Sequence, residues 1–237
     1  MTSYRSLSGQ ALRLLCVCAL MAFTVSIFAQ EGQQKWADML TQRQAEINLN
    51  LQKPGEKIII AGDSHSAFTA DASVCDTNVV NAGANGATTA RYLELLERIR
   101  FKEKAQQSIV LIGTNDAYRK RAVSIAEFRI NAEKIIWNLS RVSERVVVAA
   151  LPPVSWTRIA EFDDAQAGEF STTLQGICER FSNCTFSDPH RDYRDPDRPG
   201  AANSESYMSE DGVHLANYRA LTEKLSICPA VSAANFE

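Results

Sequence analysis

Short apolar segments alternate with amphipathic ones from residue 57 to residue 226 of this chain. The apolar segments cover residues 57–62, 77–83, 108–113, 145–151 and 184–188. Runs this short and this apolar are typical of strands that are buried on both faces of a sheet. The chain is therefore expected to belong to the α/β class, with a parallel sheet covered by helices on both faces.

The segments between these strands carry the apolar stripe of amphipathic helices. Residues 88–100 and 125–139 repeat apolar side chains at helical spacing, and Ser124 with Glu127 forms a capping-box pattern before the second. Two further helices are expected over about residues 167–181 and 214–226. Because parallel strands end at the same edge, the loops that follow them are expected to meet there.

The first 29 residues differ from the rest of the chain. They contain Arg5 and Arg13, no acidic residue and the apolar run 14–29, which is the pattern of a signal peptide. A membrane anchor formed by residues 14–29 is the alternative. Residues 30–56 are expected to form a helix and linker, and residues 57–237 a single domain. The expected location is periplasmic or secreted, without stable membrane insertion if the signal is cleaved.

Four cysteines lie beyond that segment, at Cys75, Cys178, Cys184 and Cys228. An even number of cysteines in an exported protein predicts two disulfides. Three pairings are possible. Proximity in the sequence favours Cys178–Cys184, which leaves Cys75–Cys228, and the alternative is four thiols buried as small hydrophobic residues.

Composition and motifs exclude several classes of function. Apolar residues make up 45% of the chain and charged residues 22%, as in globular proteins. The net charge of −3 provides no basic surface for nucleic acid. The sequence has no phosphate-binding loop, no dinucleotide fingerprint and no cysteine or histidine spacing of a metal site. No metal, organic cofactor or nucleic-acid partner is expected, and the sequence does not define an oligomeric state.

Four polar blocks follow one another along the chain, and three of them come directly after a predicted strand. The blocks are Gly62-Asp63-Ser64, the segment 81–89 with Gly86, Gly113-Thr114-Asn115-Asp116, and Asp211-Gly212-Val213-His214. Together they resemble the SGNH/GDSL hydrolase superfamily, which is named for a Ser, a Gly, an Asn and a His in separate blocks. The resemblance extends over about residues 57–226. It implies a flavodoxin-like three-layer α/β/α sandwich with a mainly parallel five-stranded sheet.

The resemblance also implies the roles of individual residues. Ser64 would be the nucleophile, His214 its base, and Asp211 the carboxylate that orients His214. The donors to a developing oxyanion would be the backbone N–H groups of Ser64 and Gly86 and the side-chain amide of Asn115. An imidazole suits the role of base because it titrates near neutral pH.

Each of these residues also has a structural interpretation. Ser64 could cap the following helix, and His214 could be a surface residue near a helix start. Gly86 and Asn115 could serve only as turn residues, and Gly83 is an alternative oxyanion donor.

Several neighbouring residues are expected to be structural or have no assigned role. Asp63 and Asp116 are expected to bond to nearby backbone, and His65 to be packed or solvent-facing rather than to contact substrate. His190 is given no role. Possible substrate contacts are Trp156, Arg158, Tyr193 and Tyr207.

The predicted function is an exported ester hydrolase that forms an acyl-enzyme on Ser64. Carbohydrate O-acetyl esters are the favoured substrates, because the loops are polar and show no obvious apolar flap. The alternatives are a lysophospholipase or thioesterase acting on lipid, an acyltransferase, and a catalytically silent binding module on the same fold.

Overall fold

The computed structural model describes residues 32–73, 75 and 77–228 of the chain. The chain separates into two compact units, Met1–Gln42 and Arg43–Glu237. In the first unit, residues 32–42 are helical; the second begins with helical residues 43–51 and contains the whole sheet. The predicted signal segment 1–29 lies outside the described residues. Within the described part of the chain, no helix is long and apolar enough to span a membrane.

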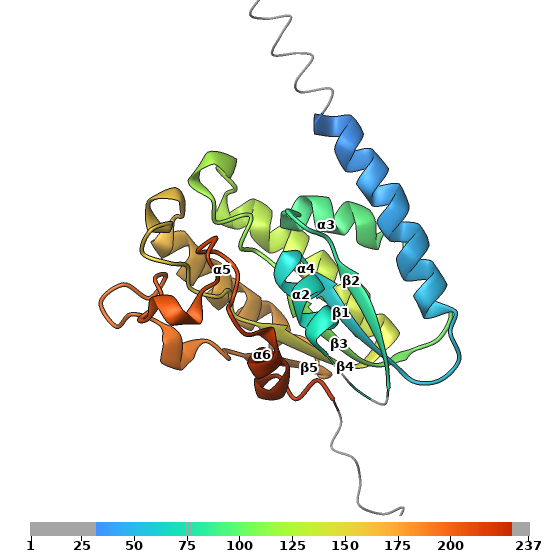
Figure 1. Ribbon diagram of the computed structural model, residues 1–237. Coiled ribbons are helices and arrows are strands. Elements are labelled where there is room, and N and C mark those ends of the chain that lie inside the picture. Colours follow the sequence, from blue (N-terminus) through green and yellow to red (C-terminus); the bar gives the residue numbers. More distant parts are fainter. Residues whose placement is uncertain (1–31, 74, 76, 229–237) are drawn as a thin grey trace, which may run out of the picture. The chain divides into compact units, whose positions relative to one another are not determined.

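A five-stranded parallel sheet in the order β2-β1-β3-β4-β5 organises the second unit (Figure 1). The strands are β1 (Lys57–Gly62), β2 (Asn78–Gly83), β3 (Ala105–Leu111), β4 (Ser143–Ala149) and β5 (Cys184–Ser187). This is the flavodoxin-like strand order, as expected. The order reverses between β1 and β3, and at such a point the loops after the two strands diverge and leave a crevice.

Helices and short 3₁₀ turns lie before, between and after the strands in the described residues. The helix of residues 32–51 comes first, followed by α2 (Ser64–Ala72), α3 (Thr89–Leu96), α4 (Ile125–Val142), α5 (Asp164–Cys178) and α6 (Tyr218–Lys224). Helices α2 and α6 pack together, whereas α4 packs between α3 and α5. The sheet therefore lies between two helical layers, which makes the predicted sandwich.

Alternate residues of each strand enter the two halves of the core, as the two-residue period of a strand requires. Ile58, Ile60, Ile109 and Leu111 share one cluster with Leu221 and Leu225 of the α6 region. The intervening residues, such as Ile59 and Val110, are equally buried. Burial on both faces explains why these strands are apolar runs without alternation.

Several predicted boundaries were wrong, and local capping explains them. The last helix begins at Tyr218 rather than at residue 214, because Asn217 caps it and Leu215 pairs with Met208 in an antiparallel bridge. The helix expected from residue 167 begins at Asp164, with Asp163 accepting a bond from the Gln166 amide. The helix expected over 88–100 ends at Leu96, and the third strand spans Ala105–Leu111 instead of residues 108–113.

The two predicted disulfides are confirmed. One joins Cys178 to Cys184 at the carboxyl end of α5, and the other joins Cys75 to Cys228 across 153 residues. The second links the segment after α2 to the segment after α6. It therefore fastens together the two chain segments that follow the helices on one face of the sheet.

Candidate active site

The carboxyl end of β1 leads directly into helix α2, and the turn between them requires glycine. Gly62 has a φ of +138°, and a Cβ there would lie 1.9 Å from the Leu111 carbonyl oxygen. Asp63 is the N-cap of α2, since its carboxylate accepts a hydrogen bond of 2.9 Å from the His65 amide. Ser64 is the first residue of the helix. The helix cap is therefore Asp63, and the alternative role of Ser64 as the cap was wrong.

Ser64 meets a histidine from a loop 150 residues further along the chain. His214 Nε2 lies 2.8 Å from Ser64 Oγ, and His214 Nδ1 lies 2.5 Å from Asp211 Oδ2. The structure thus brings together the serine, histidine and aspartate that the sequence predicted. A hydroxyl, an imidazole and a carboxylate in this order can pass a proton from the hydroxyl to the imidazole.

The loop that carries Asp211 and His214 is built around the aspartate. Asp211 Oδ1 accepts bonds from the Val213 and His214 amides, both 2.9 Å long, and from Ser209 Oγ at 2.8 Å. Gly212 permits the turn with a φ of +69°. Partial burial would raise the pKa of Asp211, but the hydrogen bonds from His214, Val213 and Ser209 outweigh it. The pKa is held well below its usual range, so the carboxylate facing His214 is ionised.

The residues expected to donate to an oxyanion line the same cavity as Ser64 and His214. Both Gly86 and Asn115 belong to its wall. Gly86 adopts a φ of +73°. Gly83 does not line this cavity: its amide donates to Asn81 Oδ1 at 3.0 Å, and a Cβ there would lie 2.3 Å from the Ala67 nitrogen. The geometry therefore favours Gly86 over Gly83 as the donor.

Two buried aspartates connect the loops of the site. Asp116 accepts hydrogen bonds from the Thr89 amide and from Thr89 Oγ1, at 2.9 and 2.6 Å, so it joins the loop after β3 to the start of α3. Burial raises the pKa of Asp116 to about 6 and that of Asp63 to about 7. Hydrogen bonds act in the opposite direction and limit the rise in pKa. They come from Thr89 for Asp116 and from the His65 amide for Asp63. Both side chains bond to nearby backbone, as the sequence predicted.

Aromatic side chains that carry no motif pack around the His214 ring. Phe68 meets the ring edge-on, with 4.8 Å between the centroids. His65 is buried, lies 5.2 Å from His214 between ring centroids, and bonds through Nδ1 to the Tyr218 hydroxyl at 2.8 Å. Burial first, and then the charge of His214, lower the pKa of His65 well below its usual value. His65 is thus a packed, neutral imidazole.

The cavity beside Ser64 has a volume of about 610 Å³, within the usual range for small-molecule sites. Of the four residues suggested as substrate contacts, only Arg158 lines it. The sequence interpretation missed Phe68, Asn85, Tyr118, Glu161 and Glu210, which also line it. Phe68 lies on α2 and Asn85 lies within the block 81–89, whereas Tyr118, Glu161 and Glu210 come from loops and short helical turns with no motif.

The other three suggested contacts lie outside the cavity wall. Tyr193 and Tyr207 stack on each other with 3.9 Å between ring centroids, and Arg198 lies over the Trp156 ring at 5.4 Å. Tyr193 and Tyr207 therefore pack within the segment that connects β5 to α6, and Trp156, from the loop after β4, contacts Arg198 of that segment.

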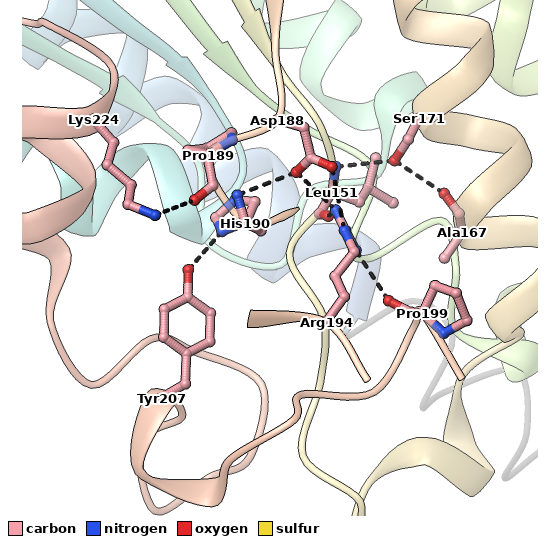
Figure 2. A network of polar contacts seen from close by, with 10 residues as sticks. All are labelled: Leu151, Ala167, Ser171, Asp188, Pro189, His190, Arg194, Pro199, Tyr207 and Lys224. Atoms are coloured by element: carbon pink, nitrogen blue, oxygen red, sulfur yellow. Dashed lines mark hydrogen bonds and ion pairs between the residues drawn. The ribbon is translucent and has the colours of Figure 1, made fainter. Parts of the chain in front are cut away.

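A buried polar network holds that connecting segment in place (Figure 2). Arg194 pairs with Asp188 at 3.2 Å and donates to the carbonyl oxygens of Leu151 and Pro199, at 2.6 and 3.1 Å. His190 is fully buried and lies 2.7 Å from the Tyr207 hydroxyl through Nδ1. Burial, together with the charges of Arg194 and Lys224, lowers the pKa of His190 to about 3. The network fixes the segment that leads to Asp211.

Fold and site together define an α/β hydrolytic enzyme with a serine, histidine and aspartate at the carboxyl edge of its sheet. Residues 26–217 match the model of the GDSL-like lipase/acylhydrolase family. The chain belongs to that family and is an ester hydrolase. No curated protein matches this chain significantly.

Solved structures share the fold at low sequence identity. One is a Streptococcus pneumonia protein described provisionally as a platelet activating factor. It is 21% identical to this chain with a TM-score of 0.69, and the match covers 86% of this chain and 97% of that chain. A lipase/acylhydrolase from Enterococcus faecalis is 23% identical, with a TM-score of 0.59 and coverages of 73% and 94%. An acetylxylan esterase from Geobacillus stearothermophilus is 16% identical, with a TM-score of 0.53 and coverages of 72% and 94%. At these identities the similarity concerns the fold.

Proposed function

We propose that this chain is an exported serine esterase that removes small acyl groups, chiefly acetyl, from the hydroxyls of carbohydrates. The observation that carries the catalytic part is the contact of His214 Nε2 with Ser64 Oγ at 2.8 Å, together with Asp211 on the other ring nitrogen. A serine hydroxyl is a weak nucleophile unless a base removes its proton. Here the base is in place before substrate arrives.

In the first half of the reaction, His214 Nε2 takes the Ser64 proton as Oγ attacks the ester carbonyl carbon. Asp211 keeps the other ring nitrogen protonated and stabilises the imidazolium that forms. The tetrahedral intermediate collapses when the bond to the alcohol oxygen breaks. The imidazolium gives its proton to that oxygen, so the alcohol leaves neutral and the acyl group stays on Ser64.

The negative charge on the carbonyl oxygen of the intermediate needs donors that are already oriented. We assign this role to the N–H groups of Ser64 and Gly86 and the side-chain amide of Asn115. Asp116, the neighbour of Asn115, is anchored to Thr89 at the start of α3, shortly after Gly86. This link supports a fixed spacing between the two loops that supply the donors.

In the second half, water replaces the alcohol. His214 takes a proton from the water as the water oxygen attacks the acyl carbonyl carbon. When the bond to Ser64 Oγ breaks and the acid leaves, His214 returns this proton to Ser64. The net reaction is ester plus water to carboxylic acid plus alcohol. Ser64, His214 and Asp211 return to their starting state.

The chemistry of the cavity supports a small acyl group and a polar alcohol. Its polar lining includes Thr114, Asn115, Thr157, Arg158, Glu161 and Glu210, whereas its aromatic and aliphatic lining residues are Phe68, Tyr118 and Val213. A long acyl chain gains about 0.8 kcal/mol for each buried methylene, which requires an extended apolar groove. The acetylxylan esterase among the structural neighbours shows that this fold accommodates a carbohydrate ester in another protein.

Export is supported by the two disulfides and by the signal-like pattern of residues 1–29. Disulfides persist in oxidising compartments such as the periplasm or the extracellular space.

An acyl-chain series tests this proposal. Purified protein would be assayed with p-nitrophenyl acetate, butyrate, octanoate and palmitate, and with an acetylated xylo-oligosaccharide, with the Ser64→Ala variant as the blank. We expect kcat/KM to be highest for acetyl and the saccharide to be deacetylated. A rise with chain length would indicate a lipid esterase instead. Equal inactivity of wild type and Ser64→Ala on all substrates would indicate a binding module.

A further inference from the structure

One side of the active-site cavity is formed by Tyr118, Arg158 and Glu161, which we call the 118/158/161 wall. Its two chain segments are fastened together. Tyr118 pairs with Phe162 in an antiparallel bridge, and the two rings are in contact at a tilt of 39°, with 4.0 Å between centroids. The Asp163 amide also donates to the Ala117 carbonyl oxygen at 2.9 Å. The wall is therefore a single built surface rather than two independent loops.

The wall carries a matched pair of charges at the cavity surface. Arg158 Nη2 lies 3.1 Å from Glu161 Oε2, and the two side chains are 37% and 46% exposed. Arg158 Nε is buried and has no hydrogen-bond partner among the described residues. Such a pair offers several donors and acceptors at fixed positions while adding no net charge. A neutral ligand with several hydroxyl groups suits this surface better than an anion or a hydrocarbon chain.

The position of Arg158 indicates which half of the ester the wall would contact. A Cβ added to Gly212 would lie 2.6 Å from Arg158 Cγ, so the stem of Arg158 packs against the turn between Asp211 and His214. In the proposed reaction His214 gives its proton to the leaving alcohol oxygen. The alcohol must therefore leave on the side of the His214 loop, which is the side where Arg158 packs.

The size of the cavity agrees with this assignment. An acetyl group fills only a small part of about 610 Å³, so most of the space belongs to the alcohol. Tyr118 adds an aromatic side chain with a hydroxyl to this side of the cavity, and its ring is held between contacts with Phe162 and Lys120 Nζ, which lie 4.0 and 5.1 Å from it. Glu210, which also lines the cavity, adds a further acceptor.

We propose that Arg158 and Glu161, with Tyr118 beside them, form a subsite that binds the hydroxyls of the sugar ring bearing the scissile ester. This subsite rests on the proposed esterase function and deepens it. It would act mainly in binding the carbohydrate alcohol, and so would distinguish a sugar ester from an ester of a simple alcohol.

The test compares two acetyl esters that differ only in their alcohol. Arg158→Met keeps the aliphatic stem on Gly212 and removes the guanidinium, and Glu161→Gln removes the negative charge. For each variant, kcat/KM would be measured on an acetylated xylo-oligosaccharide and on p-nitrophenyl acetate. Arg98→Met is the matched control, since Arg98 pairs with Glu94 on α3 with similar exposure and does not line the cavity.

We expect the ratio of the two kcat/KM values, saccharide over p-nitrophenyl acetate, to fall about 10- to 100-fold in each wall variant, mainly through KM. The control should leave the ratio unchanged. An unchanged ratio in both wall variants would overturn the subsite. Wild-type activity on p-nitrophenyl acetate with none on any acetylated saccharide would overturn it too, while leaving the esterase standing. If wild type and Ser64→Ala were equally inert on p-nitrophenyl acetate, both proposals would fall.

Discussion

Two segments of this molecule place an aspartate shortly before a histidine, and the fold uses them differently. In residues 211–214 the Asp211 carboxylate contacts the His214 ring, which in turn contacts Ser64. In residues 188–190 the Asp188 carboxylate pairs with Arg194, while the His190 ring contacts the Tyr207 hydroxyl (Figure 2). The first histidine opens onto a cavity, and the second is fully buried.

Burial and hydrogen-bond partners, rather than residue type, decide what each of these histidines can do. A histidine that bonds to a carboxylate through one ring nitrogen and to a hydroxyl through the other can accept the hydroxyl proton and later donate it. Among the described residues, no carboxylate bonds to the His190 ring, and burial with the nearby charges of Arg194 and Lys224 lowers its pKa to about 3. It stays neutral at ordinary pH and serves to hold the chain in place.

The largest contrast is between the two histidines themselves. Replacing His214 by Gln should lower kcat by about 10⁴- to 10⁶-fold, because the base for Ser64 is lost. Replacing His190 by Gln should leave kcat per folded molecule within about twofold and instead lower the free energy of unfolding by about 1–3 kcal/mol, through the lost Tyr207 contact. Ester hydrolysis and urea unfolding of both variants would measure this. Comparable losses of kcat in the two variants would contradict the contrast.

Asp211 and Asp188 should differ in their effect on kcat in the same way as the two histidines. Asp211→Asn should reduce kcat by about 10²- to 10⁴-fold, since an amide can neither orient the correct tautomer nor stabilise the imidazolium. Because the pKa of Asp211 is held well below its usual range, its ionisation should not produce the acid limb of the wild-type pH–rate profile. Asp188→Asn is the matched control and should keep kcat. Steady-state kinetics across pH 4–9 would decide, and equal losses would argue against the assigned role of Asp211.

Arg194 should matter for stability alone. Its guanidinium bonds to Asp188, Leu151 and Pro199, and its side chain is only 19% exposed. Arg194→Met should therefore lower the free energy of unfolding by about 2–4 kcal/mol, because Asp188 and two carbonyl oxygens lose their donor. Chemical unfolding would measure the loss, with Arg219→Met on α6 as an exposed control. A loss below about 0.5 kcal/mol would show that the network in Figure 2 contributes little.

The last effect concerns the dependence of stability on pH. The pKa of His190 falls from 6.5 to about 3 on folding, so below pH 6.5 the unfolded chain binds a proton that the folded chain does not. Stability due to this residue is complete above pH 6.5 and is lost as the pH falls toward 3, at up to about 1.4 kcal/mol per pH unit. His190→Gln should therefore lose less stability than wild type between pH 7 and pH 4.5. The raised pKa of Asp63 makes its contribution to stability change with pH in the opposite direction. Asp63 is present in both wild type and His190→Gln, so its contribution cancels when the two stabilities are subtracted.

Much of the fold was predictable because the strands are buried on both faces and therefore read as apolar runs. Gly62, Ser64, Gly113 and Asn115 follow such runs directly, so their position at one edge of the sheet followed from the strand pattern. Asp211 and His214 were identified through the resemblance of their block to the superfamily, and their spacing suits a turn closed by the carboxylate. Helix ends were less predictable, because caps such as Asp163 and Asn217 compete with other nearby polar residues.

The cavity wall could not be predicted, because contacts between distant segments shape it. The Ser155 amide donates to the Gly212 carbonyl, and the Val154 amide to the Gly200 carbonyl, both at 2.8 Å. Glu205 receives bonds from Ser155 Oγ and from the Trp156 amide. None of these pairs is marked by sequence spacing. The positions of Arg158 and Glu161 beside the cavity depend on them.

The central claim is that Ser64 is the nucleophile, and covalent labelling tests it most directly. The nearest rival is Ser66, whose hydroxyl is buried and lies 2.7 and 2.9 Å from the carbonyl oxygens of Ala61 and Leu111. Wild type, Ser64→Ala and Ser66→Ala would be treated with a fluorophosphonate, digested and examined by mass spectrometry. We expect one adduct on Ser64 in wild type and in Ser66→Ala, and none in Ser64→Ala. An adduct on Ser66, or labelling that survives in Ser64→Ala, would contradict it.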